Sequence, residues 1–305
     1  KKKTKTFSNM PKGFEQLQTW LNHYAANSTQ TIILMEATSI YHERLAKYLF
    51  DAGYQVCVTN PARARYFAQS MSKLNKTDKA DSEVLARFAM TADLHFWQPL
   101  PEHIQLLNAL LDRRAVLCED LQREKNRLEK AESTFTIEPV LQSIHKSIKQ
   151  LNKHIQDIDQ QIDDHIDQNP DLKNDKELLS SIPAIADRTS LLMLSFLRSH
   201  NFERASQAAA FVGLVSIQRQ SGSSIHGRSR LSKAGSSKIR AGLYMAAIVA
   251  TRHNPHIKEM NERLLANGKT KMMAIGAAMR KLVHLCYGVL KHQQPYQENY
   301  CINSQ

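Results

Sequence analysis

At residues 76–85 the chain reads Lys76-Thr77-Asp78-Lys79-Ala80-Asp81-Ser82-Glu83-Val84-Leu85, which places two carboxylates three residues apart where a helix is predicted to begin. Residues i and i+3 of a helix lie on one face, so Asp78 and Asp81 can share a divalent cation. A third carboxylate, Glu36, follows the apolar run of residues 32–35. Hard oxygen ligands at a strand end and on a helix face suit Mg²⁺ chemistry on phosphates. These three side chains are therefore candidate Mg²⁺ ligands.

The same two aspartates also have a structural interpretation. Asp78 at the start of a helix can act as its N-cap, and Asp81 in the first turn can interact with the helix dipole. Neither role needs a metal. The spacing of the two aspartates does not by itself separate these roles from metal binding.

Residues 1–95 are predicted to form an α/β domain. Helical and strand patterns alternate along this part of the chain, and strands that alternate with helices indicate a largely parallel sheet. Gly53 suits the end of the second helix, and Asn60-Pro61 breaks the chain after the second strand. The expected helices cover residues 11–26, 41–52 and 78–91, with a short one after Pro61, and the expected strands cover residues 31–36 and 54–59.

Residues 96–172 are predicted to form a helical coiled-coil spacer. Residues 104–131 have a helical pattern, and a second helix is expected after a connection near residues 135–139. In that second helix apolar residues recur at steps of four, three, four, three and four, which is a coiled-coil seam. So short a repeat fits an intramolecular hairpin as well as a coiled coil between protomers. The seam consists of Ile144, Ile148, Leu151, Ile155, Ile158 and Ile162.

The composition indicates a polyanionic partner. The 305 residues include 41 Lys and Arg against 29 Asp and Glu, a net charge of +12. Nucleic acid is favoured over a membrane, because no isolated basic amphipathic helix lies at either end and no apolar run is long enough to span a bilayer. The four cysteines show no C-x-x-C spacing, so neither a zinc site nor a disulfide framework is predicted. We expect a cytoplasmic location, since no signal peptide opens the chain.

Residues 173–305 are predicted to form a helical, basic C-terminal domain. Near its start, Ser181-Ile182-Pro183-Ala184-Ile185-Ala186 is similar to a helix-hairpin-helix turn, in which glycines let backbone N–H groups approach a phosphate. Ala184 and Ala186 stand at the glycine positions here. A turn with a purely structural role is therefore an equal alternative.

A second chemical constellation lies in the C-terminal domain. Between residues 204 and 258 the chain has nine Lys or Arg residues and no Asp or Glu, and six of the nine lie between residues 219 and 240 in a Gly- and Ser-rich stretch. Small hydroxyl residues among cations can hold a phosphodiester and place a serine to attack phosphorus. A solvated loop with serine turns is the alternative, although solubilising surfaces usually mix charge signs. Chemistry alone leaves Ser221, Ser223, Ser224 and Ser232 as candidate nucleophiles.

Taken together, these motifs resemble those of the DEDD transposases of bacterial insertion sequences, a family that also contains the Piv-type DNA invertases. The resemblance runs across nearly the whole chain. The order of the motifs, with Glu and Asp-x-x-Asp before a coiled coil and Ser-Gly after it, is more specific than any single one. The matching stretches are Met35-Glu36-Ala37-Thr38, Asp51-Ala52-Gly53-Tyr54, Asn60-Pro61, Asn75-Lys76-Thr77-Asp78-Lys79-Ala80-Asp81, Ser181-Ile182-Pro183, Ala210-Phe211-Val212-Gly213-Leu214, Ser221-Gly222-Ser223-Ser224, Arg230-Leu231-Ser232-Lys233-Ala234-Gly235 and Gly288-Val289-Leu290-Lys291.

The resemblance implies a RuvC-like (RNase H-like) fold for residues 1–95 and a transposase domain after the spacer. It implies that Glu36, Asp78 and Asp81 are Mg²⁺ ligands together with an Asp on an opening strand, and that Ser221 is the nucleophile. That opening strand is absent from the sequence shown, in which residues 6–9 correspond to a later strand. We expect it upstream of Lys1; the alternative is an inactive protein. The family also implies a structured guide (bridge) RNA that pairs with donor and target DNA.

The predicted function is therefore RNA-guided DNA recombination by an insertion-sequence transposase, through a covalent phosphoserine. Base pairing with the RNA is expected to supply specificity while the protein reads backbone and shape. Because the carboxylates and the serine lie far apart in sequence, a homo-oligomer, either a dimer or a tetramer, is expected to assemble the active site. The residues predicted to hold the phosphate are Arg219, Arg228, Arg230 and Lys233.

Two other functions fit the same residues. A RuvC-like structure-specific DNA nuclease would use metal-activated water, so Ser221 would be replaceable. A non-enzymatic nucleic-acid-binding coiled-coil protein would need neither Asp78 nor Asp81. His226 can assist proton transfer near Ser221 or contact a phosphate, and the sequence does not decide between these roles.

Overall fold

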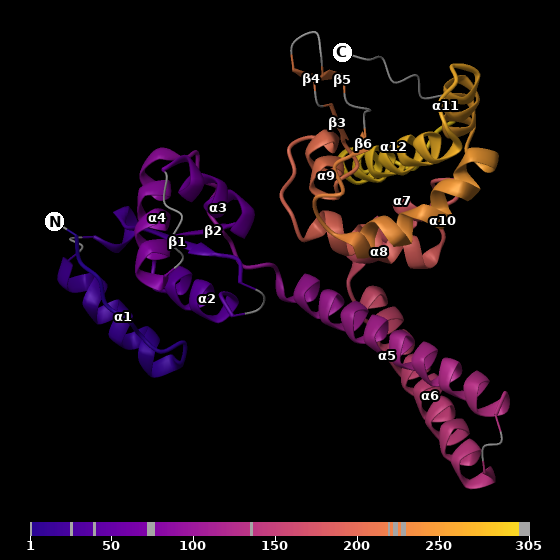
Figure 1. The fold of residues 1–305 in the computed structure, drawn as a ribbon, viewed down its shortest axis with the longest axis horizontal. Helices are drawn as coiled ribbons and strands as arrows, with labels where there is room; N and C mark the ends of the chain where they lie inside the picture. The colour runs from indigo at the N-terminus through magenta and orange to yellow at the C-terminus, as the bar shows by residue number, and fades with distance from the viewer. Residues whose placement is uncertain are drawn as a thin grey trace. The chain divides into compact units, whose positions relative to one another are not determined.

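The computed structural model describes residues 2–24, 27–38, 41–71, 77–134, 137–218, 220–221, 225–226 and 230–298, with the backbone alone described at 220, 221, 225 and 226. The chain divides into two compact units, Lys1–Leu100 and Pro101–Gln305 (Figure 1). Helices dominate, and the described strands form three two-stranded sheets. The spacer and the C-terminal helices thus belong to one unit, and the division into three domains stays a prediction.

The first unit contains the predicted alternation of helices and strands. Its two strands pair in parallel, with Ile32 opposite Gln55 and Glu36 opposite Thr59. Residues 6–9, which the family resemblance relates to a strand, form no strand. The elements in chain order are α1 (Pro11–Tyr24), a short 3-10 helix (Ser28–Gln30), β1 (Ile32–Glu36), α2 (Glu43–Asp51), β2 (Gln55–Thr59), α3 (Pro61–Ser70) and α4 (Asp78–Thr91).

β1 is paired along one edge. Among the described residues no strand pairs with its other edge, and Ile32 is 41% exposed. A cleft of about 820 Å³ lies beside the strand, between the N-terminal segment, α1 and α4, and both Ile32 and Leu34 line it. Strands of a parallel sheet are normally covered on both faces and paired with neighbours. The surface beside β1 therefore has room for further sheet.

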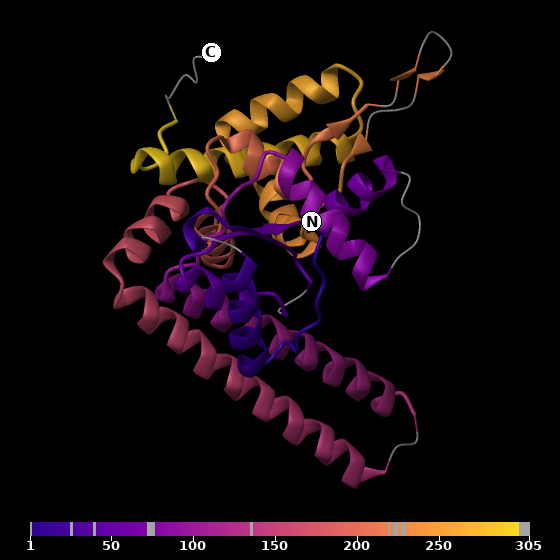
Figure 2. The same ribbon diagram turned by 90° about the vertical axis from the view of Figure 1, so that its left-hand side faces the viewer.

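The second unit begins with a long helical hairpin made of α5 (Glu102–Glu132) and α6 (Glu138–Asp167). The two helices pack side by side along their length (Figures 1 and 2). The predicted seam faces α5, and it is buried at Ile162 but only half-buried at Ile144 and Ile148. An intramolecular hairpin is thus present, and contact with a second protomer stays a prediction.

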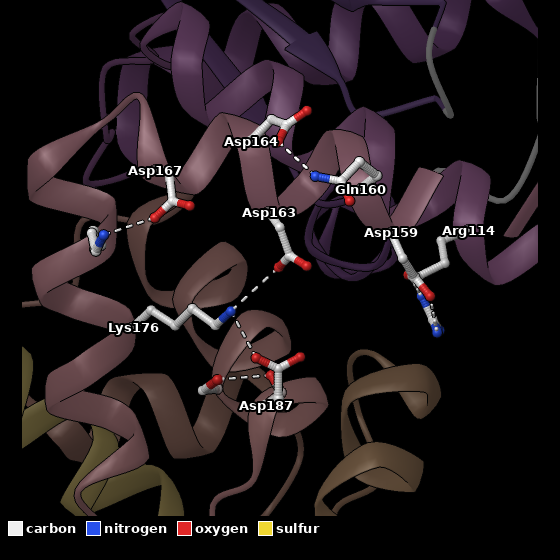
Figure 3. Close-up of polar contacts among 10 residues, drawn as sticks. Arg114, Asp159, Gln160, Asp163, Asp164, Asp167, Lys176 and Asp187 are labelled. Atoms are coloured by element: carbon white, nitrogen blue, oxygen red, sulfur yellow. Dashed lines mark hydrogen bonds and ion pairs between the residues drawn. The ribbon is translucent and has the colours of Figure 1, made fainter. Parts of the chain in front are cut away.

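Ion pairs fix the base of the hairpin (Figure 3). The guanidinium of Arg114 on α5 holds both carboxylate oxygens of Asp159 on α6, and this hydrogen bonding raises the pKa of Arg114. Lys176, on α7 (Pro170–Ser180), lies between the carboxylates of Asp163 and Asp187, at 3.6 and 2.7 Å. Asp187 begins α8 (Asp187–Arg198), so these contacts join the hairpin to the C-terminal helices.

The C-terminal helices pack around α12. Cys286 on this helix is fully buried, which raises the pKa of its thiol to about 12. Among the described helices α12 alone is long and apolar enough to cross a membrane, but half of it is buried inside the unit, as expected of a core helix. The remaining elements are α9 (Ala205–Phe211), α10 (Ser237–His253), α11 (Pro255–Ala266) and α12 (Lys271–His292), with four short strands between α9 and α10.

The turn between α7 and α8 has the backbone of a glycine turn. Ala184 has a φ of +82°, in the left-handed region that glycine adopts without steric cost. The second alanine of the motif, Ala186, has an ordinary φ of −87° and precedes α8. At the first glycine position of the helix-hairpin-helix motif the backbone therefore has the conformation of a glycine, and Ala184 adopts it under strain.

We expect Ala184→Gly to stabilise the chain by about 0.5–1 kcal/mol, because it removes the left-handed strain of a side chain. Ala241→Gly, in the exposed part of α10, is the control and should destabilise by about 1 kcal/mol. Urea unfolding measures both. A loss of stability in Ala184→Gly would show that the turn is not strained.

Candidate catalytic and nucleic-acid-binding sites

The three predicted metal ligands lie on two neighbouring elements of the first unit. Glu36 ends β1, and Asp78 and Asp81 lie in the first turn of α4, which packs against β1. Side chains alternate along a strand, so Glu36 lies on the same face as Ile32 and Leu34. Those two residues line the cleft beside α4, whereas Glu36 lines a separate pocket together with Tyr41 and His42. The carboxyl end of a parallel strand is also the edge at which α/β proteins bind ligands.

The cap of α4 is not Asp78. The hydroxyl of Thr77 accepts a hydrogen bond from the backbone N–H of Ala80 at 3.2 Å, which makes Thr77 the N-cap. The structural interpretation of Asp78 as the cap is therefore wrong. Within the part of the chain that the structure describes, the carboxylates of Asp78 and Asp81 form no hydrogen bond or ion pair, and Asp78 is exposed. Both are free to bind a ligand.

A complete metal site is not assembled by these residues alone. Among the described residues, no group of three or more His, Cys, Asp and Glu side chains is placed to hold a metal ion. The donor chemistry suits Mg²⁺, and one buried hydroxyl nearby, that of Thr59 opposite Glu36, has no hydrogen-bond partner. Metal binding by Glu36, Asp78 and Asp81 stays a prediction.

We expect Asp78→Asn and Asp81→Asn to change the free energy of unfolding by roughly 0.5 kcal/mol or less without metal, because each loses only an interaction with the helix dipole. Thr77→Ala removes the cap and should cost about 1 kcal/mol. Urea titrations in a chelator compare the three variants. If Asp78→Asn costs as much as Thr77→Ala, the aspartate has a structural role.

The predicted nucleophile lies in an arm between α9 and α10, which we call the serine arm and define as residues 216–231. At its base β3 (Ser216–Ile217) pairs with β6 (Arg230–Leu231), and beyond it β4 (Gln220–Ser221) pairs with β5 (Ile225–His226), both antiparallel. In both ribbon views the β4–β5 pair stands clear of the helices (Figures 1 and 2). Ser221 is thus carried on a β-arm outside the helical body.

Only some of the predicted phosphate-binding residues are described. Arg230 and Lys233 are exposed and, within the described part of the chain, have no ion-pair partner. Arg219 and Arg228 lie outside the described residues, as do Ser223 and Ser224, and the side chains of Ser221 and His226 are also outside them. Arg230 and Lys233 therefore remain available to a phosphate at the base of the arm.

Other polar residues of the basic stretch have internal roles. The hydroxyl of Ser232 accepts a hydrogen bond from the N–H of Ala234 at 3.1 Å, which is a serine turn. Lys238 pairs with Asp112 of α5 at 2.6 Å. Arg240 donates to backbone carbonyls beside the arm. The run of cations in the sequence is therefore not one uniform anion-binding surface.

Sequence reasoning missed Arg280, which lies on α12. Its guanidinium donates to the carbonyl of Leu214, just before the arm, at 3.3 Å. No local pattern around Arg280 points to this contact, because the two residues are 66 positions apart.

Two histidines of the second unit have pKa values that burial lowers. His200 packs among Phe196, Phe202 and Phe211, and burial lowers its pKa. Burial also lowers the pKa of His284, one turn from Arg280, and the positive charges of Arg280 and Lys281 lower it further. The Nε2 atom of His284 is buried and has no hydrogen-bond partner among the described residues. Protonation of either histidine therefore opposes folding.

We expect the stability of the chain to fall as the pH drops below about 6.5. A lowered pKa means that the unfolded chain binds the proton more readily, so stability is full above the ordinary histidine value and is lost below it. Urea midpoints at about pH 7.5 and about pH 5.5 measure the effect. His200→Phe should reduce the difference, and His145→Phe, exposed on the hairpin, should not. An unchanged difference in His200→Phe would contradict this role.

Comparison with known proteins gives matches in both units. A transposase family profile, DEDD_Tnp_IS110, matches residues 1–134, which include all three carboxylates. A second profile, for transposases of the IS116/IS110/IS902 family, matches residues 176–262, which include the serine arm.

Individual relatives agree with these profiles. The "Pilin gene-inverting protein" of Moraxella bovis is 31% identical over 295 residues, which cover 96% of this chain and 90% of the relative. The protein of the same name from Moraxella lacunata matches with the same identity and coverage. An uncharacterized 43.6 kDa protein of insertion element IS110 from Streptomyces coelicolor is 24% identical over 121 residues, 39% of this chain and 30% of that protein.

Proposed function

Because the chain belongs to the IS110 family of transposases, we propose that it cuts and rejoins DNA through a covalent link between Ser221 and a DNA phosphate. The observation that carries the proposal is the serine arm. Its β4–β5 pair presents Ser221 outside the helical body, and the exposed Arg230 and Lys233 lie at its base. A nucleophile that has to reach a duplex phosphate needs such an exposed, positively charged setting.

The chemistry conserves phosphoester bonds. The Ser221 hydroxyl attacks phosphorus and gives up its proton to solvent, a P–Oγ bond forms, and the bond from phosphorus to the leaving DNA oxygen breaks. Attack by the hydroxyl of another strand then reverses the exchange and frees the serine. No external energy source is needed, since each broken ester is replaced by another. Arg230 and Lys233 neutralise charge on the phosphate in both steps, with Arg219 and Arg228 expected to join them.

The first unit is proposed to supply a Mg²⁺ site. Glu36, Asp78 and Asp81 would hold the ion together with an acid on a further strand, and Mg²⁺ when bound polarises the scissile phosphate. Two features of the described residues support this proposal: the carboxylates at the start of α4, which have no partner among them, and the edge of β1 beside a wide cleft, at which no described strand pairs. A strand added at that edge would extend the sheet toward the RuvC-like (RNase H-like) architecture.

The proposed partners are donor DNA, target DNA and a structured guide RNA. The net charge of +12 favours such polyanions. The carboxylates and Ser221 belong to different compact units. A homo-oligomer would allow the carboxylate unit of one protomer to serve the serine of another, and the exposed apolar side chains of Leu106, Val116 and Val140 on the hairpin offer surface to such a partner. The match to pilin gene-inverting proteins over 96% of this chain favours DNA inversion as a second outcome of the same chemistry.

We expect a denaturing gel of the protein with Mg²⁺, the RNA of its element, and labelled donor and target DNA to show a protein–DNA adduct. Ser221→Ala should lower adduct formation by at least about 10³-fold, as loss of a nucleophile does. Ser232→Ala, whose hydroxyl forms a turn, should keep it within about tenfold.

The remaining outcomes separate the alternatives. Cleaved DNA without an adduct, unaffected by Ser221→Ala, would make the protein a metal-dependent nuclease. DNA binding without cleavage, unaffected by Asp78→Ala and Asp81→Ala, would make it a non-enzymatic binder.

A further inference from the structure

The described residues at the base of the serine arm have little packing of their own. Ile217 and Arg230 at its base are exposed, and a lone two-stranded pair is only marginally stable in water. Leu231 is half-buried and rests on Gly276 of α12, where an added Cβ would lie 2.9 Å from the leucine Cδ1 atom. The direction in which the arm holds Ser221 must therefore be set where the arm joins the helices.

One arginine joins both ends of the arm. Arg240, half-buried on α10, donates from Nη1 to the carbonyl of Val212 at 2.9 Å and to the carbonyl of Gly235 at 3.1 Å. Val212 precedes the arm and Gly235 follows it. A single guanidinium thus fixes the separation of the entering and leaving backbone.

A second arginine fixes the entering backbone from another helix. Arg280 on α12 donates to Leu214. Beside this contact the ladder of β3 and β6 continues, with the N–H of Ser232 bonded to the carbonyl of Val215 at 2.8 Å and the N–H of Lys233 to Gly213 at 3.1 Å. The base of the arm is therefore tied to α10 and α12 as well as to itself.

The backbone segments at the base of the arm are packed too closely for either segment to shift. Gly213 and Gly235 have φ angles of +79° and +105°, and a Cβ on Gly235 would lie 1.9 Å from the carbonyl oxygen of Phe211. So close an approach holds only while both strands keep their places. Arg240 and Arg280 supply the hydrogen bonds that keep them there.

The contacts of these arginines distinguish them from phosphate-binding cations. Among the described residues neither forms an ion pair with a carboxylate, and their hydrogen bonds go to neutral carbonyls. The N–H bonds of Nη1 have fixed directions in the guanidinium plane, toward two carbonyls in Arg240 and one in Arg280, whereas a lysine ammonium is a compact charge on a flexible stem. If charge alone mattered at these positions, lysine would serve as well.

We propose that Arg240 and Arg280 are positioning residues that hold the serine arm in the direction needed for attack on phosphorus. This inference rests on the function proposed for Ser221. In this inference the two arginines orient the arm that carries Ser221, and Arg230 and Lys233 bind the DNA phosphate.

The test compares Arg240→Lys and Arg280→Lys with Arg252→Lys, an exposed position on α10 that serves as the matched control. Each protein is assayed for adduct formation, DNA affinity and amide hydrogen exchange across residues 213–235. We expect Arg240→Lys and Arg280→Lys to lower the adduct rate by about 10- to 100-fold, as small misplacements of a reacting group do. Their DNA affinity should stay within about twofold, exchange in the arm should quicken, and Arg252→Lys should match the parent protein.

A further variant displaces the arm without touching either arginine. Gly213→Ala would place a Cβ 2.2 Å from the backbone carbonyl oxygen of Ala234 at a φ of +79°, so it should also quicken exchange in the arm and lower the adduct rate while the helices stay protected. It tests the inference even if an arginine variant fails to fold.

Two results would overturn the inference. One is normal arm exchange together with a normal adduct rate in Arg240→Lys and Arg280→Lys. The other is a loss of DNA affinity in proportion to the loss of adduct, which would make these arginines phosphate ligands. If the parent protein forms no adduct at all, the proposed function fails, and hydrogen exchange still decides whether the arginines hold the arm.

Discussion

The burial of α12 is the constraint on which the second unit depends. This helix is apolar along most of its length, and α7, α9, α10 and α11 cover it. Burying such a surface supplies the main favourable free energy of this part of the fold. It also fixes α10 relative to α12, and those two helices carry Arg240 and Arg280. The direction of the serine arm is therefore a consequence of how one core helix is packed.

The ion pairs of the second unit have different structural roles depending on whether they are buried or exposed. Asp175 is buried and pairs with Arg198 at 2.5 Å. Removing either charge would leave the other without a partner, which is destabilising for a buried pair. The exposed pair of Lys238 and Asp112 contributes little stability, but it links α10 to α5. Lys176 between Asp163 and Asp187 similarly sets the direction of the hairpin (Figure 3). Buried pairs thus specify the core, and exposed ones align its attachments.

Local patterns predicted the elements well, because their signals are local. The start of α4 at Asp78 and the parallel strands on either side of α2 follow from caps, apolar runs and breakers. The identity of the cap was harder, since Thr77 and Asp78 are adjacent and both can cap. The roles of Lys238, Arg240 and Arg280 depend on partners far away in the chain, which composition cannot reveal. The order of motifs predicted the family, which the comparisons confirm, whereas the metal ligands and Ser221 remain predictions.

The anchoring of the arm by α12 also has a consequence for protein synthesis. A ribosome completes Ser221 well before it reaches Arg280, and domains form as units while the chain emerges. Until α12 is made and released, the arm lacks both its second arginine and the helix on which Leu231 rests. A nascent or prematurely terminated chain therefore carries the serine without a defined direction. Among the described helices α12 is the last in chain order, so the base of the arm gains its second arginine contact only after the other described helices have been made.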